Sequence, residues 1–135
     1  MTADIQPMKR DNQLSQLQIT IMHILWEKKE AGAAEVHRTL KKTRSLAFTT
    51  VATLLSRLEK RGLITHRTQG RTYIYQPKVQ EDEVRRSMVR DVVDRLFKGH
   101  TSELVSHLLT ENQISPGDLK KVRSLIDKAE KKGSK

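Results

Sequence analysis

The sequence contains no cysteine among its 135 residues. This absence excludes disulfides, thiolate metal sites and cysteine nucleophiles. Only 4% of the residues are aromatic, which leaves too few rings for the base-stacking platforms of proteins that bind single-stranded RNA. No run approaches the roughly 20 apolar residues of a membrane-spanning helix, so we expect no membrane insertion. The polar segment 1–13 lacks the apolar core of a signal peptide, and we expect a cytoplasmic protein.

The sequence also lacks the motifs of common enzyme classes. Its five histidines are scattered and show no HExxH spacing. Its glycines do not cluster into a phosphate-binding loop. Acidic residues are mostly interleaved with Lys and Arg, which is typical of solvated helix faces. We therefore expect no enzyme, no catalytic residues, no metal site and no cofactor.

What the chain has in excess is positive charge, and this charge is unevenly distributed. The net charge is +10, from 26 basic and 16 acidic residues. Residues 38–71 hold nine basic side chains, opposed by the single acid Glu59. A protein that needs charge only to stay in solution has no reason to concentrate it in one quarter of the chain. A surface that neutralises phosphates does, because each contact releases counterions from the nucleic acid.

The pattern of residues 14–78 predicts three helices and a hairpin. Ser15 and Gln18 have the spacing of a capping box at the start of a helix that ends near Lys29. A short helix is expected over 34–42 and a third over 48–60, with Gly62 at the position that follows a helix end. Residues 63–67 and 71–75 are rich in strand-forming residues and flank a turn that contains Gly70. Three helices followed by a hairpin is the order of a winged helix-turn-helix domain.

The rest of the chain is expected to be helical. Apolar residues at helical spacing predict a helix over 81–98 and a short one over 102–111. Ser115-Pro116-Gly117-Asp118 has the residues of a helix start, and the helix that follows carries a single apolar stripe. We expect three parts: a disordered lead-in (1–13), a winged-helix domain (14–78) and a helical dimerisation domain (79–132). The fold class is mainly α with a small β-hairpin.

The third helix is the candidate DNA-reading element, because this helix enters the major groove in helix-turn-helix proteins. Its apolar stripe, Val51, Leu54, Leu55 and Leu58, must face the core, so the threonines and Arg57 face outward. Small hydroxyl side chains can approach bases and phosphates, and a threonine methyl can pack on a thymine methyl. The alternative is that these threonines lie on an ordinary solvated helix surface, although threonine is a poor helix former. The outward candidates are Thr49, Thr50, Thr53 and Arg57.

Four further cations are candidate contacts to the DNA backbone. Arg67 and Arg71 flank the glycine turn of the hairpin, where a wing adds affinity without selecting bases. A solvated turn is the alternative for these two. Lys42 and Arg44 follow the second helix, where they either contact DNA or interact with the negative end of that helix.

Several short motifs appear in order along residues 12–130. They are Leu14-Ser15, Ile21-Met22, Leu25-Trp26-Glu27, Phe48-Thr49-Thr50-Val51, the run from Arg57 to Ile64, and Tyr73-Ile74-Tyr75 before Pro77. Together they resemble the penicillinase repressor family of the BlaI/MecI type. The resemblance implies a homodimer that binds a palindromic operator in double-stranded DNA through its winged helices and interlocks through its C-terminal helices. It also implies a repressor of transcription.

The broad apolar faces of residues 81–129 agree with this dimer, because a chain this short has little else to cover them. Packing against the first helix of the same chain is the alternative. The candidate dimerisation residues are Val92, Leu96, Phe97, Leu104, Leu108, Leu119, Val122, Leu125 and Ile126.

The resemblance further implies relief of repression by a membrane sensor metalloprotease pathway that leads to cleavage in the dimerisation region. The pair that corresponds to the cleaved Asn-Phe bond of staphylococcal-type members is His107-Leu108, so the cleavage motif itself is not kept. Copper sensing through a C-terminal cysteine site, which related repressors use, is excluded by the lack of cysteine. Two other functions stay open on the residues alone: a winged-helix regulator gated by a small molecule, and an architectural protein that binds DNA without sequence preference.

Overall fold

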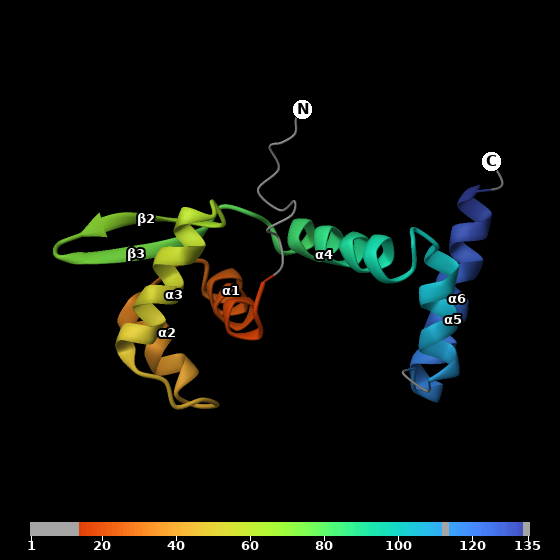
Figure 1. Cartoon of the computed structure of the whole chain (residues 1–135), viewed down its shortest axis with the longest axis horizontal. Helices are drawn as coiled ribbons and strands as arrows, with labels where there is room; N and C mark the ends of the chain where they lie inside the picture. The colour runs from red at the N-terminus through yellow and green to blue at the C-terminus, as the bar shows by residue number, and fades with distance from the viewer. Residues whose placement is uncertain (1–13, 112–113, 134–135) are drawn as a thin grey trace. The chain divides into compact units, whose positions relative to one another are not determined.

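The structure is a computed structural model that describes residues 14–111 and 114–133. The predicted lead-in, residues 1–13, lies outside the described residues. The chain divides into two compact units after Arg90. The elements in chain order are α1 (Gln16–Lys28), β1 (Ala31–Gly32), α2 (Ala33–Leu40), α3 (Phe48–Lys60), β2 (Ile64–Gln69), β3 (Thr72–Pro77), α4 (Glu81–Leu96), α5 (Thr101–Thr110) and α6 (Pro116–Gly133). Figure 1 labels all of them except β1.

The predicted start of the first helix is confirmed. The hydroxyl of Ser15 accepts a hydrogen bond of 3.1 Å from the backbone N–H of Gln18. The side chain of Gln18 in turn accepts one of 3.0 Å from the backbone N–H of Ser15. This reciprocal pair satisfies two of the N–H groups that every helix leaves without a partner at its start.

The first unit has one hydrophobic core, to which α1, α2, α3 and the sheet all contribute. Leucine, isoleucine, valine and methionine side chains recur at helical spacing on each helix, so each helix has one apolar face to bury. The largest fully buried side chains are Ile21, Met22, Leu25, Val36, Leu40, Val51, Leu55, Leu58, Leu63 and Ile64.

The end of α3 sets the direction of the hairpin. Gly62 has φ +80°, a conformation that side chains with a Cβ rarely adopt. Its N–H donates to the carbonyl of Glu59 at 2.9 Å, and the N–H of Leu63 donates to that of Leu58 at 3.1 Å. This pair of bonds is a Schellman motif, and it closes the helix at the position that the sequence predicts.

The predicted hairpin is confirmed, and it belongs to a larger sheet. β2 and β3 are antiparallel, with His66 opposite Tyr75 and Gln69 opposite Thr72. β1, which the sequence does not predict, pairs with the other edge of β3, so the strand order is β1-β3-β2. The order helix, helix, helix, hairpin and the mainly α fold class are therefore confirmed, with a three-stranded sheet in place of a two-stranded one.

The start of α4 belongs to the first unit. Val84 is buried and Met88 packs against the core of that unit. The indole N–H of Trp26 donates to the carbonyl of Val79 at 2.9 Å, which fixes the segment before α4 on α1. The sequence places the division after residue 78, where the strand ends, because it does not reveal that α4 begins on the core.

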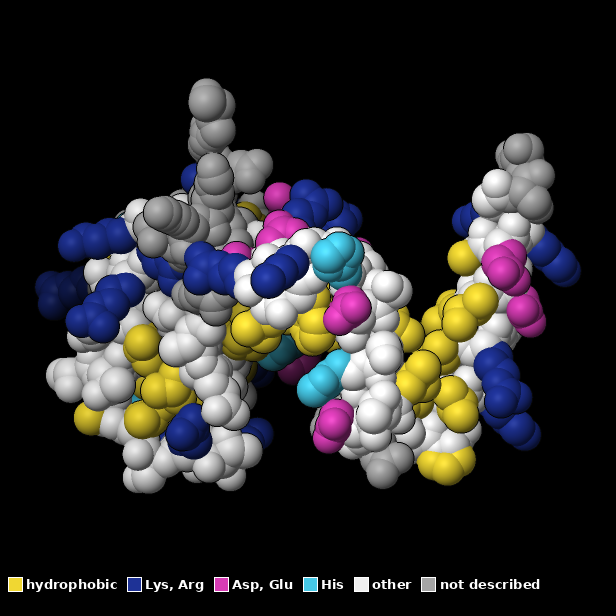
Figure 2. All heavy atoms as spheres, turned by 45° about the vertical axis from the view of Figure 1, so that its right-hand side comes forward, with side chains coloured by type: hydrophobic (Ala, Val, Ile, Leu, Met, Phe, Trp, Pro, Cys, Tyr) yellow, Lys and Arg dark blue, Asp and Glu magenta, His cyan; other side chains and the backbone are white. Residues whose placement is uncertain are grey.

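The second unit comprises the last turns of α4 together with α5 and α6. A turn with positive φ at Lys98 and Gly99 separates α4 from α5. Ser115 accepts a hydrogen bond of 3.1 Å from the N–H of Asp118, which confirms the predicted start of α6. Neither α5 nor α6 has a buried residue. Figure 2 shows exposed apolar side chains along the C-terminal helices, in the right-hand part of the view.

Candidate nucleic-acid interface

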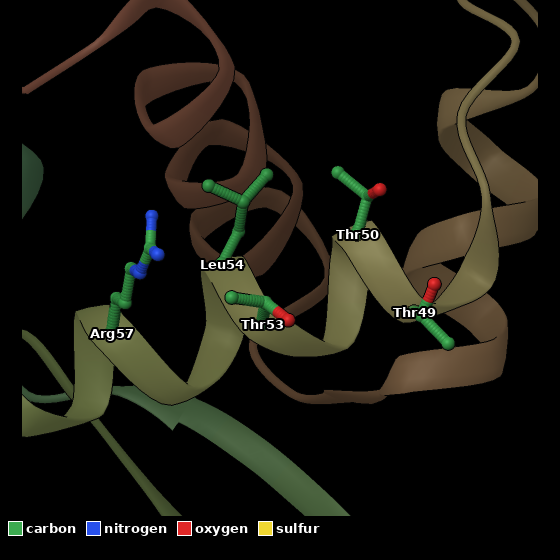
Figure 3. A pocket seen from close by; sticks show the side chains of 5 residues that line it. All are labelled: Thr49, Thr50, Thr53, Leu54 and Arg57. Carbon is green, nitrogen blue, oxygen red and sulfur yellow. The ribbon is translucent and has the colours of Figure 1, made fainter.

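The exposed face of α3 brings four of the predicted DNA contacts together. Because Val51, Leu55 and Leu58 are buried, the polar residues between them face solvent. Leu54, which was predicted to face the core with them, is only half-buried. Thr49, Thr50, Thr53 and Arg57 are exposed, and with the half-buried Leu54 they line an open hollow of about 220 Å³. Figure 3 shows the five side chains projecting from successive turns of α3.

The hollow combines three kinds of chemistry. The threonines and Leu54 present methyl groups, the threonine hydroxyls can donate or accept hydrogen bonds, and Arg57 presents a guanidinium. No residue in the described part of the chain forms an ion pair with Arg57. A face of this kind can contact the methyl group of thymine, the edge of guanine or a phosphate.

The connector between α2 and α3 places two more of the predicted cations. Lys42 and Arg44 are exposed in the turn that follows α2, where the N–H of Arg44 donates to the carbonyl of Leu40 at 2.8 Å. The imidazole Nε2 of His37 lies 2.8 Å from the carbonyl oxygen of Leu46, and this contact fixes the connector against α2. Both cations therefore stand a few residues before the start of α3.

The two arginines of the wing occupy different positions. Arg71 is exposed in the two-residue turn that it forms with Gly70, at the tip of the hairpin. Arg67 lies along β2, and its Nη2 is 3.0 Å from the carboxylate of Glu30. Arg71 is therefore free to meet a ligand, whereas Arg67 already has an anionic partner.

The sequence alone does not identify a cluster that joins the wing to α3. The Nδ1 atom of His66 in β2 lies 2.7 Å from the Oε2 atom of Glu59 in α3. The imidazole is stacked on the ring of Tyr73, with a centroid distance of 3.9 Å and an interplanar angle of 12°. Burial raises the pKa of the neighbouring Tyr75, and Glu59 and Tyr73 raise it further. The alternation of strand residues could have placed these rings on one face, but their contact with α3 requires the tertiary structure.

The predicted dimerisation residues lie in the second unit. Their side chains are exposed or half-buried, and the most exposed are Leu96 at 72% and Leu125 at 62%. His107 and Leu108 lie inside α5, where the ring of His107 meets that of Phe97 edge to face. The other predicted dimerisation residues are Val92, Leu104, Leu119, Val122 and Ile126.

No three His, Cys, Asp or Glu side chains within residues 14–111 and 114–133 are grouped so that they could hold a metal ion. In the same part of the chain, no helix has both the length and the apolar character that a membrane span requires.

Comparison with known proteins shows related proteins along most of the chain. Residues 14–128 match the family model described as penicillinase repressor. The penicillinase repressor of Bacillus licheniformis is 25% identical over 120 residues, which covers 89% of this chain and 94% of that protein. The methicillin resistance regulatory protein MecI of Mammaliicoccus sciuri is 23% identical and covers 86% of this chain and 94% of its own. The solution structure of the DNA binding domain of the repressor BlaI is 32% identical, with a TM-score of 0.50, and covers 56% of this chain and 93% of its own.

Proposed function

Since the chain belongs to the penicillinase repressor family, we propose that it represses transcription by binding a palindromic operator in double-stranded DNA as a homodimer. The observation that carries this proposal is the exposed face of α3, on which Thr49, Thr50, Thr53 and Arg57 line one hollow within a winged-helix fold. The relative from Bacillus licheniformis is named a penicillinase repressor, and the similar solved structure is the DNA binding domain of the repressor BlaI. A repressor of this kind acts in the cytoplasm, where its operator lies.

In this proposal α3 enters the major groove. The threonine methyls and Leu54 contact thymine methyl groups, and Arg57 contacts either a guanine edge or a phosphate. The cations outside α3 follow the sugar-phosphate backbone, which fixes the register of the protein without reading sequence. These cations are Lys42 and Arg44 before α3 and Arg71 at the tip of the wing, with Arg67 as a further contact once it leaves Glu30.

The second copy of the chain is the proposed partner of the C-terminal helices. α5 and α6 carry apolar stripes but bury none of their residues within one chain. Leu96, Leu125 and Ile126 are at least half-exposed, and a large exposed apolar surface of this kind marks an interaction site. Isologous pairing of these helices and of the end of α4, which carries Leu96, would cover that surface on both copies at once.

A dimer explains how an operator with two half-sites is bound tightly. The two copies of α3 would dock in successive major grooves about 34–36 Å apart. When one half-site is bound, the second binds at a high effective concentration, so the dimer holds the operator far more tightly than a monomer does. Separation of the C-terminal helices would therefore release the DNA.

Proteolysis in the second unit is the proposed way to achieve that separation, through a membrane sensor metalloprotease pathway as in the family. The candidate bond, between His107 and Leu108, lies within α5, and a protease needs an extended substrate. α5 has no buried residue, so its local unfolding would break few buried apolar contacts. Cleavage there would remove α6 from the pairing surface.

Transcription in vitro tests the proposal directly. A template with the promoter region upstream of the chain's own gene is transcribed at increasing protein concentration, beside an unrelated promoter as control. We expect transcription to fall on the first template alone, and the fall to need a higher protein concentration with Arg57→Ala. Equal transcription of both templates at every protein concentration would contradict the repressor function.

A further inference from the structure

The ion pair between Arg67 and Glu30 joins the wing to the turn before β1. Glu30 stands directly before β1, which pairs with one edge of β3, while Arg67 lies in β2 on the other edge. Arg67 is opposite Ile74 in β3. The arginine side chain therefore crosses β3 to reach the carboxylate, at 3.0 Å.

The ion pair of Arg67 and Glu30 lies on the face of the sheet opposite the rings of His66, Tyr73 and Tyr75. Side chains alternate between the two faces of a strand, so Arg67 and its neighbour His66 point in opposite directions. His66 contacts Glu59 of α3, and Arg67 consequently lies on the face directed away from that contact. Its Nη1 atom also donates to the side chain of Gln69 at 2.8 Å. In the free protein the guanidinium is thus held by a carboxylate and an amide oxygen.

Solvent exposure makes this pair easy to exchange. The side chains of Arg67 and Glu30 are each 46% exposed. Exposed ion pairs contribute little stability, because water screens them and two long side chains must be ordered. A DNA phosphate is also an oxygen anion that arginine binds in the same fork geometry, and it lies in the strong negative field of the duplex.

We propose that Glu30 is an intramolecular competitor for DNA phosphate, which occupies Arg67 in the free protein and lowers the sequence-independent part of its DNA affinity. The inference rests on the proposed function, because it assumes that the wing meets the backbone of a duplex. Glu30 touches no base, so it lowers the affinity for every sequence by the same factor. The competition makes binding depend more heavily on the base contacts of α3.

A double-mutant cycle with Glu30→Gln, Arg67→Ala and the double variant tests this proposal. Affinity for a random-sequence duplex is measured by fluorescence anisotropy between 50 and 200 mM salt, conditions under which phosphate contacts dominate. We expect Glu30→Gln to bind about two- to fivefold more tightly than the wild type, as removal of one exposed ion pair allows. The slope of log affinity against log salt should also steepen by up to about 0.9, the value of one phosphate contact. In the Arg67→Ala variant, the additional change Glu30→Gln should have little effect on the affinity for the duplex.

Glu35→Gln is the matched control. Glu35 carries the same charge and forms an exposed ion pair at 3.4 Å, but its partner is Lys28 of α1 and not a residue of the wing. If Glu35→Gln raises the affinity as much as Glu30→Gln does, the effect is one of net charge and the proposal is overturned. It is also overturned if the effects of Glu30→Gln and Arg67→Ala are additive, or if Glu30→Gln has no effect.

The proposed function is assessed separately with the wild type, by comparing the duplex from its own promoter with the random one. A lack of preference there would contradict the specific repressor, and the cycle on the random duplex would still decide the role of Glu30. Circular dichroism and thermal unfolding of each variant establish that folding is retained, which we expect because both side chains are half-exposed.

Discussion

The imidazole Nδ1 of His66 lies 2.7 Å from the carboxylate of Glu59, and this contact joins the wing to the last turns of α3. The stacked ring of Tyr73 covers one side of the imidazole. The two side chains are only 26% and 31% exposed, so the pair is partly shielded from water. The contact therefore helps to hold the hairpin against α3.

Loss of this contact should destabilise the first unit. We expect Glu59→Ala to lower the free energy of unfolding by about 1 kcal/mol, the usual net value of a hydrogen bond that is partly shielded from water. Urea unfolding followed by circular dichroism measures the change. His66→Ala with Glu59→Ala should cost less than the two single changes added together. Additive costs would mean that the contact contributes nothing.

Arg57 can be assigned to a base or to a phosphate by two substitutions. If Arg57 binds a guanine edge with both ends of its fork, Arg57→Ala should cost about 1–3 kcal/mol of operator affinity and relax the sequence preference. Arg57→Lys is the matched control, because it keeps the charge and loses the planar fork. Gel-shift titrations with operator and random duplex give both quantities. An equal loss on both duplexes, largely restored by lysine, would identify a phosphate contact.

The cost of a substitution at Gly62 should come from the backbone conformation alone. A Cβ at this position would meet no atom within 4 Å, but φ is +80°. We therefore expect Gly62→Ala to destabilise the first unit by about 1 kcal/mol through strain. Gly62→Asn should cost less, because asparagine tolerates this conformation better than alanine. Urea unfolding of the two variants compares them, and equal costs would show that strain is not the cause.

The pairing of two chains depends on the exposed stripe of the second unit. Leu125→Asp should abolish the dimer, because an unpaired charge would have to be buried in the interface. Ser124→Asp introduces the same charge at the adjacent position, about 100° around α6, and should leave the dimer intact. Sedimentation equilibrium measures the oligomeric state of each variant. A dimer that survives Leu125→Asp would contradict the proposed interface.

Local signals in the sequence were sufficient for most of the fold. The capping box of Ser15 and Gln18 and the helix end at Gly62 depend on residues a few positions apart, so their patterns are visible before folding. The bounds of α3 follow from its apolar spacing for the same reason. β1 was missed because Ala31–Gly32 is too short to show an alternating pattern, and it is a strand only through its pairing with β3.

The candidate interface was predictable only in part. The outward positions of Thr49, Thr50, Thr53 and Arg57 follow from the helical period once the buried face is known. The partner of Arg67 is 37 residues away in sequence, and the partner of His66 lies in a different element. Such contacts are made by tertiary packing, and no local pattern encodes them.

The most direct test of the central claim is a gel-shift titration at about 150 mM salt. It compares duplex DNA that carries the palindrome of the chain's own promoter with a scrambled duplex of equal length. We expect a preference of about 10³ or more for the palindrome, with two chains bound per duplex. Similar affinity for both duplexes, falling steeply with salt, would contradict it and would identify the basic surface as that of a non-specific architectural protein.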